Sequence, residues 1–309
     1  MADIRQRSGL RLAETRGMSD TRTTTGADTV KIGDKTVSRI AFGAMRLADS
    51  AIWGPPGDRD HSIRLARKAV ELGVDHIDTA DSYGLGTVEE ILREALHPYP
   101  DHLLIATKIG QVQPRPGEWV PVGHPAFLRH QCEMSLRRLD VDRIDLLYLH
   151  RVDANVPFAD QVGAMKELQD EGKIAHFGLS EVGRKQIEDA RAIVDVAAVQ
   201  NIYNLSTRLW DDVVEYCTRE RVPFVPWFPI MNGELAQSGG VVAEIAAETG
   251  ATPAQIALAW LLARADMICP IPGTSSIAHL KENVDASSLR LTDTQISRLS
   301  EPSAGLSGQ

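Results

Sequence analysis

The chain has 309 residues, of which 43% are hydrophobic and 24% are charged, proportions typical of a globular protein with a sizeable core. Its formal net charge of −9 disfavours nonspecific binding to nucleic acid or to an anionic membrane, while still allowing a local basic pocket for a small anion. No segment approaches the ~18 consecutive apolar residues that span a bilayer, so neither a nucleic acid nor a membrane is expected as a partner.

The N-terminal segment combines arginines, acidic residues and a run of threonines, and it has no apolar stretch typical of a secretory signal. We expect residues 1–28 to form a disordered tail, with either Met1 or Met18 as the translation start. The three cysteines (Cys132, Cys217 and Cys269) are far apart and lack metal-ligand spacing, which favours reduced thiols. We therefore expect a cytoplasmic protein without a metal site.

Short apolar runs alternate with amphipathic stretches along the rest of the chain. The first two extended segments flank the turn-prone Asp34, which predicts an N-terminal β-hairpin. Eight apolar runs of strand length follow, within residues 39–45, 76–80, 103–109, 144–150, 174–180, 196–203, 222–229 and 267–273. Their continuous hydrophobicity is typical of parallel strands that are covered on both faces.

Helical patterns lie between the apolar runs. Residues 88–96 place their apolar side chains at the i, i+3, i+4, i+7 spacing of one helical face. Gly73 is a favourable residue just after a helix, and Thr252 with Gln255 forms a capping-box pattern at the start of another.

Eight strands that are each followed by a helix predict an α/β protein with a (β/α)8 TIM barrel. We expect a single barrel over residues 29–300 and a short tail at residues 301–309. The main alternative, an open doubly wound sheet, would normally carry G-x-G-x-x-G after its first strand, and this motif is absent. The long connections at residues 110–123 and 229–240 are expected to lie at the C-terminal mouth of the barrel, where active sites form.

Four polar residues lie at or just after the C-terminal ends of three successive predicted strands. Asp78 and Tyr83 follow the second strand, Lys108 ends the third, and His150 ends the fourth. Each of them alone has an ordinary structural explanation, such as a turn cap or a hydrogen-bonded core histidine. In a barrel, however, these strand ends converge, so the sequence predicts that the four side chains share one cavity.

This set of side chains suits the reduction of a carbonyl group. A tyrosine hydroxyl can donate a proton, and a nearby ammonium lowers its ordinary pKa of ~10. A carboxylate can hold the ammonium, while a neutral imidazole orients the substrate oxygen or relays a proton. A covalent nucleophile is not indicated, because no Ser or Cys lies beside a base. A metal-dependent barrel hydrolase is a more distant alternative, since Lys and Tyr are poor zinc ligands.

The stretch GVDHIDTADSYG, residues 73–84, resembles a specific motif of the aldo-keto reductase family, and the resemblance extends from about residue 30 to residue 300. It implies that Asp78, Tyr83, Lys108 and His150 form the family's catalytic tetrad, with Tyr83 as general acid. The implied activity is reduction of an aldehyde or ketone with NADPH, or less typically NADH. Some members of the family are auxiliary subunits with little turnover, so a cofactor-binding sensor is the alternative function.

The resemblance also implies a dinucleotide site across the barrel mouth. Ser180 and Gln200 are expected to bind the nicotinamide carboxamide, and Trp227 stands where many members have a stacking Tyr. Glu181 stands where Asn is common. The other expected cofactor residues are Pro229, Gly233 and Leu235 over the pyrophosphate, Gly273, Thr274, Ser275 and His279 near the adenosine phosphate, and Glu282 and Asn283 at the adenine. Because Gly273 and His279 replace a frequent Lys and Arg, the expected preference for NADPH is modest.

Two further stretches, FGAMRLADSAIWGPP and REALHPYP, are similar to a bacterial branch of the family that includes pyridoxal reductases. Trp53 and Trp119 are expected either to frame an aromatic or sugar-like substrate or to pack within their loops. Arg151 is expected either to bind an anionic group or to pair with Asp153. The sequence leaves open the physiological carbonyl substrate, the direction of the reaction, and whether the protein is a monomer or a homo-oligomer.

Overall fold

The computed structural model describes residues 29–231 and 240–301, so the expected tails fall almost entirely outside the described residues. The elements begin with β1 (Thr29–Ile32), β2 (Lys35–Ser38), β3 (Phe42–Gly43), η1 (Ala44–Leu47), α1 (Arg59–Glu71), β4 (His76–Asp78), η2 (Tyr83–Gly86), α2 (Thr87–Leu96), β5 (Leu104–Ile109), β6 (Gln111–Arg115), β7 (Glu118–Pro121) and α3 (Pro125–Leu139). They continue with β8 (Ile144–Leu149), α4 (Phe158–Asp170), β9 (Ile174–Ser180), α5 (Arg184–Arg191), β10 (Val196–Gln200), α6 (Asp211–Arg219), α7 (Val241–Thr249), α8 (Pro253–Arg264), α9 (Ile277–Asp285), η4 (Ala286–Ser288) and α10 (Asp293–Ser300).

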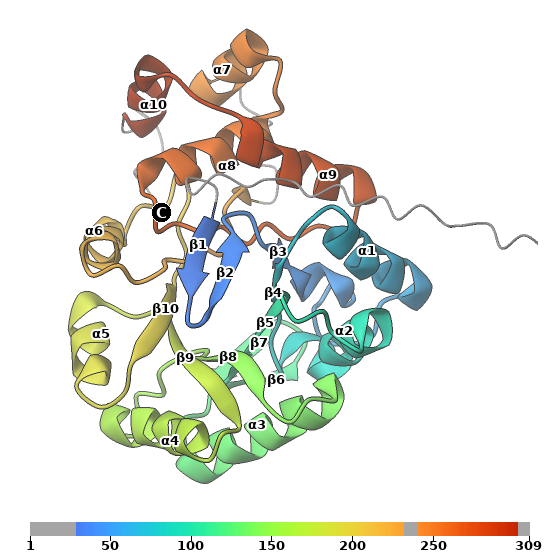
Figure 1. Ribbon diagram of the computed structural model, residues 1–309, viewed down its shortest axis with the longest axis vertical. Coiled ribbons are helices and arrows are strands. Elements are labelled where there is room, and N and C mark those ends of the chain that lie inside the picture. The colour runs from blue at the N-terminus through green and yellow to red at the C-terminus, as the bar shows by residue number, and fades with distance from the viewer. Residues whose placement is uncertain (1–28, 232–239, 302–309) are drawn as a thin grey trace, which may run out of the picture.

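Six parallel strands form one curled sheet in the order β10-β9-β8-β5-β4-β3, with helices around it (Figure 1). Two further segments close the curl through single β-bridges. Phe224 pairs with Val199 of β10 and with Ile268, and Gly273 pairs with Gly43 of β3. These bridges complete a ring of eight parallel segments, which confirms the predicted (β/α)8 barrel.

The last two predicted strands, at residues 222–229 and 267–273, differ from the expectation because they are not regular strands. Both contain several prolines, which have no backbone N–H to donate to a β-ladder. Their carbonyls still accept hydrogen bonds: Gly43 N donates to Pro272 O at 3.2 Å. Proline therefore reduces these segments to isolated bridges without opening the barrel.

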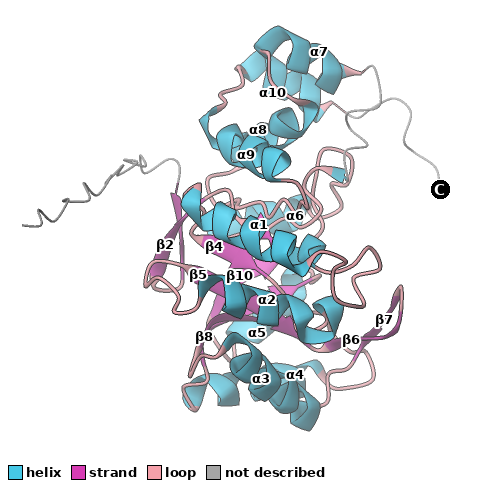
Figure 2. Cartoon of the chain, turned by 90° about the vertical axis from the view of Figure 1, so that its right-hand side faces the viewer, coloured by secondary structure: helices cyan, strands magenta, loops and turns pink. Residues whose placement is uncertain are grey.

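The predicted N-terminal hairpin is confirmed, with β1 and β2 paired antiparallel around Asp34. It covers one end of the barrel (Figure 1), and its own side chains Ile32 and Val37 are fully buried. A second hairpin, β6–β7, lies at the opposite end within the predicted long connection 110–123 (Figure 2). Gln111 and Trp119 of this second hairpin line the cavity that opens at that end of the barrel.

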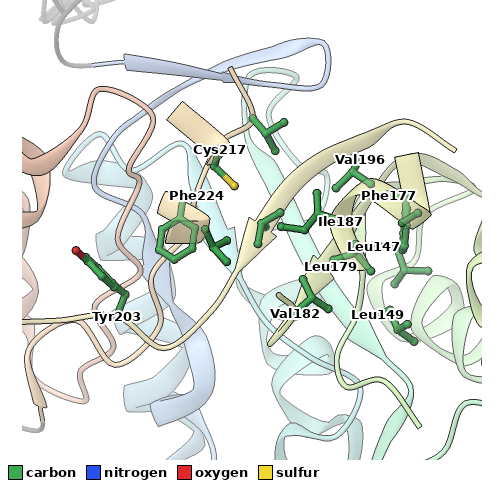
Figure 3. Close-up of a cluster of buried hydrophobic side chains, with 14 of the residues drawn as sticks. Leu147, Leu149, Phe177, Leu179, Val182, Ile187, Val196, Tyr203, Cys217 and Phe224 are labelled. Atoms are coloured by element: carbon green, nitrogen blue, oxygen red, sulfur yellow. The ribbon is translucent and has the colours of Figure 1, made fainter. Parts of the chain in front are cut away.

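The strands are buried on both faces, as their continuous hydrophobicity predicted. Alternate residues of β8 and β9, such as Leu147 and Phe177, pack against the surrounding helices (Figure 3). Their neighbours Leu146 and Tyr148 belong to a second buried cluster inside the barrel. Because side chains of a strand alternate between faces, the inward positions at the strand ends are the ones that reach the cavity.

Several local features follow the sequence closely. Helix α8 begins after Thr252, whose hydroxyl accepts a hydrogen bond from Gln255 N, while Gln255 Oε1 accepts one from Thr252 N.

The three cysteines are buried and unpaired. Among residues 29–231 and 240–301, no helix is both long and apolar enough to cross a membrane.

The turn of the β1–β2 hairpin provides a stability test at Gly33, which has a φ of +60°. A Cβ at this position would overlap the His176 imidazole, which contacts Asp34 at 2.9 Å. Gly33→Ala should therefore lower the free energy of unfolding by about 1–3 kcal/mol more than Gly117→Ala. Gly117 is the matched control, because its φ is +78° but nothing lies within 4 Å of its would-be Cβ. Equal urea midpoints for the two variants would show that His176 does not constrain the turn.

Candidate active site

A cavity of about 620 Å³ opens where the C-terminal ends of the barrel strands meet. Gly43, Asp78, His150, Gln200 and Gly273 line it from strand ends that are far apart in the sequence. Most of the other residues that line it are apolar: Met45, Ile52, Trp119, Trp227, Phe228, Pro229, Ile230, Met231 and Ile271. A mostly apolar cavity with a few converging polar groups is the usual form of a small-molecule site.

Lys108 lies directly behind this cavity, and its side chain is fully buried. The ammonium donates to Asp78 Oδ1 at 2.5 Å, to Thr79 O at 2.8 Å and to Tyr83 Oη at 3.3 Å. All three ammonium protons therefore have acceptors. Burial lowers the pKa of Lys108, but Asp78 and Tyr83 raise it by more, so its net pKa is above the ordinary value.

Asp78 and Tyr83 reach the same ammonium because the chain turns tightly between them. Asp78 is the last residue of β4, and Tyr83 begins the η2 turn that follows. Gly84 and Leu85 in this turn have left-handed backbone angles, with φ values of 59° and 53°. A Cβ on Gly84 would lie only 3.0 Å from Gly54 O, so this position needs glycine both for its φ and for space.

His150 completes the predicted tetrad. Its imidazole lies edge-on to the Tyr83 ring, with the ring centroids 6.0 Å apart. Burial, together with the charges of Lys108 and Arg151, holds the pKa of His150 well below its usual range, so the ring is neutral. Its Nδ1 has no hydrogen-bond partner among the described residues. The structure thus brings all four predicted side chains together.

Gln200 and Ser180 lie beside the tetrad at the ends of β10 and β9. Gln200 Nε2 donates to Asp78 Oδ2 at 2.8 Å, so this residue both lines the cavity and supports the tetrad carboxylate. Ser180 Oγ accepts from Arg151 Nη1 at 3.1 Å. Asp153 does not pair with Arg151, because its carboxylate accepts instead from the Gly123 and Asn155 amides.

Glu181 explains two departures from the family pattern at once. Its Oε1 accepts from Trp227 Nε1 at 2.7 Å and from Ile202 N at 2.5 Å. The backbone of Glu181 is left-handed, with a φ of 55°, a conformation that Asn adopts more readily. The carboxylate at the usual Asn position therefore orients the indole at the usual Tyr position, a pairing that the sequence could not reveal.

The predicted phosphate-binding loop begins at Gly273, which also lines the cavity. A Cβ on Gly273 would lie 3.1 Å from Gly43 O, so the glycine allows the closing barrel segments to approach. The same Cβ would lie 3.7 Å from Arg46 Cγ, and Arg46 lines the cavity. Arg46 lies within the stretch FGAMRLADSAIWGPP, but the sequence does not show that its side chain lies beside Gly273, which is 227 positions further along the chain.

Helix α9 follows this loop, and Ser276 is its N-cap. Thr274 is buried and its Oγ1 accepts from Ser276 N, whereas the carbonyl of Ser275 lies 2.7 Å from His61 Nε2. His279 and Glu282 lie on α9. Asn283, also on α9, is 2% exposed, and its Nδ2 has no hydrogen-bond partner in the described part of the chain.

The predicted substrate-pocket residues and the residues predicted over the pyrophosphate differ in where the structure places them. Trp119, Arg151 and Pro229 line the cavity. Trp53 does not: its indole donates to Gln113 O at 3.0 Å and ties its loop to β6. Gly233 and Leu235 lie outside the described residues. No group of three or more His, Cys, Asp or Glu side chains is arranged to hold a metal ion within residues 29–231 and 240–301.

Comparison with known proteins identifies the family. The profile of the Aldo/keto reductase family matches residues 39–303. The chain belongs to this family. It is 44% identical over 275 residues to an uncharacterised oxidoreductase of Schizosaccharomyces pombe, covering 89% of this chain and 90% of the relative. It is 40% identical over 279 residues to pyridoxine 4-dehydrogenase of Escherichia coli, covering 88% and 97% respectively.

Among solved structures, the barrel is similar to an aldo-keto reductase from Klebsiella pneumoniae that was crystallised in complex with NADPH. The TM-score is 0.76 at 27% sequence identity, and the match covers 89% of this chain and 95% of that one. This aldo/keto reductase is therefore an NAD(P)H-dependent oxidoreductase, as the sequence predicted.

The residues present fit a nicotinamide dinucleotide. One end of the cavity carries the tetrad with the neutral His150, and Arg46 and Gly273 also line its wall. The Nδ2 of Asn283 is a buried donor without a partner in the described chain, which suits an acceptor atom of a ligand.

Proposed function

We propose that this aldo/keto reductase reduces an aldehyde or ketone to the alcohol, with NADPH as hydride donor and Tyr83 as general acid. The observation that carries the proposal is the buried Lys108 ammonium, which contacts both Asp78 and the Tyr83 hydroxyl at the wall of the cavity. The structural likeness to a reductase crystallised with NADPH supports the choice of cofactor.

Bound NADPH supplies the hydride, and the side chains of the tetrad manage the proton. Tyr83 donates its hydroxyl proton to the carbonyl oxygen as the alcohol forms. Lys108, 3.3 Å from the hydroxyl, stabilises the phenolate that this transfer leaves behind. Because His150 is neutral, its one N–H is available to hydrogen-bond and orient the carbonyl oxygen. Asp78 keeps the ammonium in place throughout.

Replacing the proton donor tests this assignment. Tyr83→Phe keeps the ring and removes only the hydroxyl, so kcat for carbonyl reduction should fall by roughly 10²–10⁴-fold. NADPH binding, measured by quenching of tryptophan fluorescence, should persist. Tyr99→Phe is the matched control, because the Tyr99 hydroxyl donates to Leu139 O, away from the cavity. Near-normal turnover of Tyr83→Phe would refute the assignment, and NADPH binding without turnover in the wild type would favour the sensor alternative.

We propose that Arg46 supplies a cation for the cofactor phosphates in place of the Lys that the family often has at position 273. Arg46 lies beside Gly273 and lines the same cavity. A guanidinium matches the geometry of phosphate oxygens better than a lysine does. A lysine at position 273 would also place its Cβ against Gly43 O, which makes direct restoration of the family residue unfavourable.

Arg46→Met should weaken NADPH binding by roughly 10-fold or more, because a charge-assisted hydrogen bond is lost. Titration of tryptophan fluorescence with NADPH and NADH measures the effect and locates it. A loss for both cofactors indicates the pyrophosphate, and a loss for NADPH alone indicates the 2′-phosphate. Arg64→Met, on the exposed face of α1, is the control. Unchanged affinity for both cofactors in Arg46→Met would exclude this role.

We propose that the substrate carries an anionic oxygen near its carbonyl, recognised by Arg151. This guanidinium lines the cavity, and its Nη1 donates to two neutral acceptors, His150 O at 2.6 Å and Ser180 Oγ at 3.1 Å. No carboxylate of the described residues forms an ion pair with it within 4.0 Å. A largely buried cation without an ion pair is unfavourable until an anion binds beside it.

The walls next to Arg151 favour a flat substrate. Trp119 and Trp227 line the cavity, and the guanidinium lies 5.7 Å from the Trp227 ring centroid. An aromatic aldehyde with a neighbouring phenolate combines both features. Pyridoxal has this arrangement, and the 40% identity to pyridoxine 4-dehydrogenase supports it as the first substrate to test.

Arg151→Met should raise KM for pyridoxal by roughly 10- to 100-fold, the loss expected for one charge-assisted hydrogen bond. Pyridine-4-carboxaldehyde is the matched substrate, because it keeps the ring and the aldehyde but lacks the phenolic oxygen. Its KM should change little. An equal loss with both aldehydes would show that Arg151 only supports His150 and Ser180.

A further inference from the structure

A second group of buried charged side chains lies near the tetrad but does not line the cavity. We call it the Arg138 cluster: Asp81, Glu89 and Arg138 with the neutral Thr107 and Gln131. Arg138 Nε donates to Glu89 Oε2 at 2.7 Å, and Arg138 Nη2 donates to Asp81 Oδ1. Thr107 Oγ1 donates to Glu89 Oε1 and Gln131 Nε2 to Asp81 Oδ2, each at 2.6 Å. One guanidinium thus joins two carboxylates, each of which has a further donor.

The Arg138 cluster is attached to both sides of the tetrad. Asp81 lies in the turn between Asp78 and Tyr83, and its backbone N donates to Lys108 O at 3.0 Å. Thr107 precedes Lys108 in β5. The Arg138 side chain also passes over Gly86, where a Cβ would lie 2.7 Å from Arg138 Cδ. The cluster therefore connects the turn that carries Tyr83 to the strand that carries Lys108.

Stability alone does not account for these charges. Glu89 is fully buried, and the Asp81 and Arg138 side chains are only 16% and 15% exposed. Removing charges from water is costly, and apolar residues of similar volume often stabilise a fold as well or better. The charged groups instead fix geometry. A guanidinium presents its donors in a rigid, planar fork, so it holds two acceptors at a fixed position relative to each other. Arg138 thereby holds two segments together. It binds the turn at Asp81, and it binds Glu89, which in turn accepts from Thr107 of strand β5.

We propose that Asp81, Glu89 and Arg138 are positioning residues that set the distance between the Tyr83 hydroxyl and the Lys108 ammonium. The inference rests on the proposed function of the tetrad. None of the three residues lines the cavity, so they act through Tyr83 and Lys108 and not on the substrate or cofactor. Their loss should therefore affect proton donation and leave binding unchanged.

Arg138→Lys tests this role, because lysine keeps the charge but cannot bind both carboxylates with a planar fork. Displacing the proton donor should lower kcat for pyridoxal by roughly 10- to 100-fold. It should also shift the alkaline limb of the pH profile of kcat, since the ammonium no longer lies at its set distance from the phenol. KM for pyridoxal and the dissociation constant for NADPH should stay within about twofold of wild type. Arg137→Lys is the control, because Arg137 is the exposed neighbour on the same helix.

Asp81→Asn provides a second variant in case Arg138→Lys does not fold. It keeps the shape of the side chain but places an amide N–H against the donors of Arg138 or Gln131, so the same fall in kcat is expected. A folded variant of either kind with wild-type kcat and pH profile would overturn the inference. So would a loss of NADPH affinity as large as the loss of kcat, which would indicate general disruption. Failure of the proposed function looks different: the wild type would then show no turnover, or Tyr83→Phe would retain it.

Discussion

The ammonium of Lys108 is a full charge with a completely buried side chain, and the arrangement of the site follows from the need to compensate it. An ammonium in a low-dielectric interior is tolerated only when its protons are all satisfied and an opposite charge lies close by. Asp78 supplies the charge, Thr79 a carbonyl and Tyr83 a hydroxyl. The contact with Tyr83 also matters for chemistry, because the nearby ammonium stabilises the phenolate form of this side chain. The same hydrogen bonds thus compensate the buried cation and hold the hydroxyl that we propose as the proton donor.

Closure of the barrel decides what else can reach this site. The ring is completed by segments rich in proline, which accept hydrogen bonds but cannot donate them. At the last seam, Gly43 and Gly273 lie so close that a side chain at position 273 would press on the backbone of Gly43. Glycine is therefore favoured at position 273 by the close approach of the backbones, and Arg46, which lies beside it, brings a cation to the cavity wall from the opposite side of the seam.

Residues that depart from the family pattern in the sequence prove to be partners in space. Glu181 replaces a common Asn and Trp227 a common Tyr, and a hydrogen bond of 2.7 Å joins the two new side chains. The indole N–H needs a hydrogen-bond acceptor, and the Glu181 carboxylate provides one. The sequence alone does not show that the two substitutions are linked. Read together, they describe a different way of holding an aromatic ring at the same wall.

The sequence by itself determined the barrel and the tetrad, because both depend on local patterns. Apolar runs buried on two faces, helical periodicity between them and polar residues at Asp78, Tyr83, Lys108 and His150 are all visible within short windows. Only the tertiary structure decided which distant side chains meet: Arg46 with Gly273, Glu181 with Trp227, and Arg138 with Asp81 and Glu89. It also decided between the two expected roles of Trp53, whose indole packs in its loop and donates to Gln113 O. These contacts join different strand–helix units, and nothing in one unit's sequence specifies which side chain of another unit will reach it.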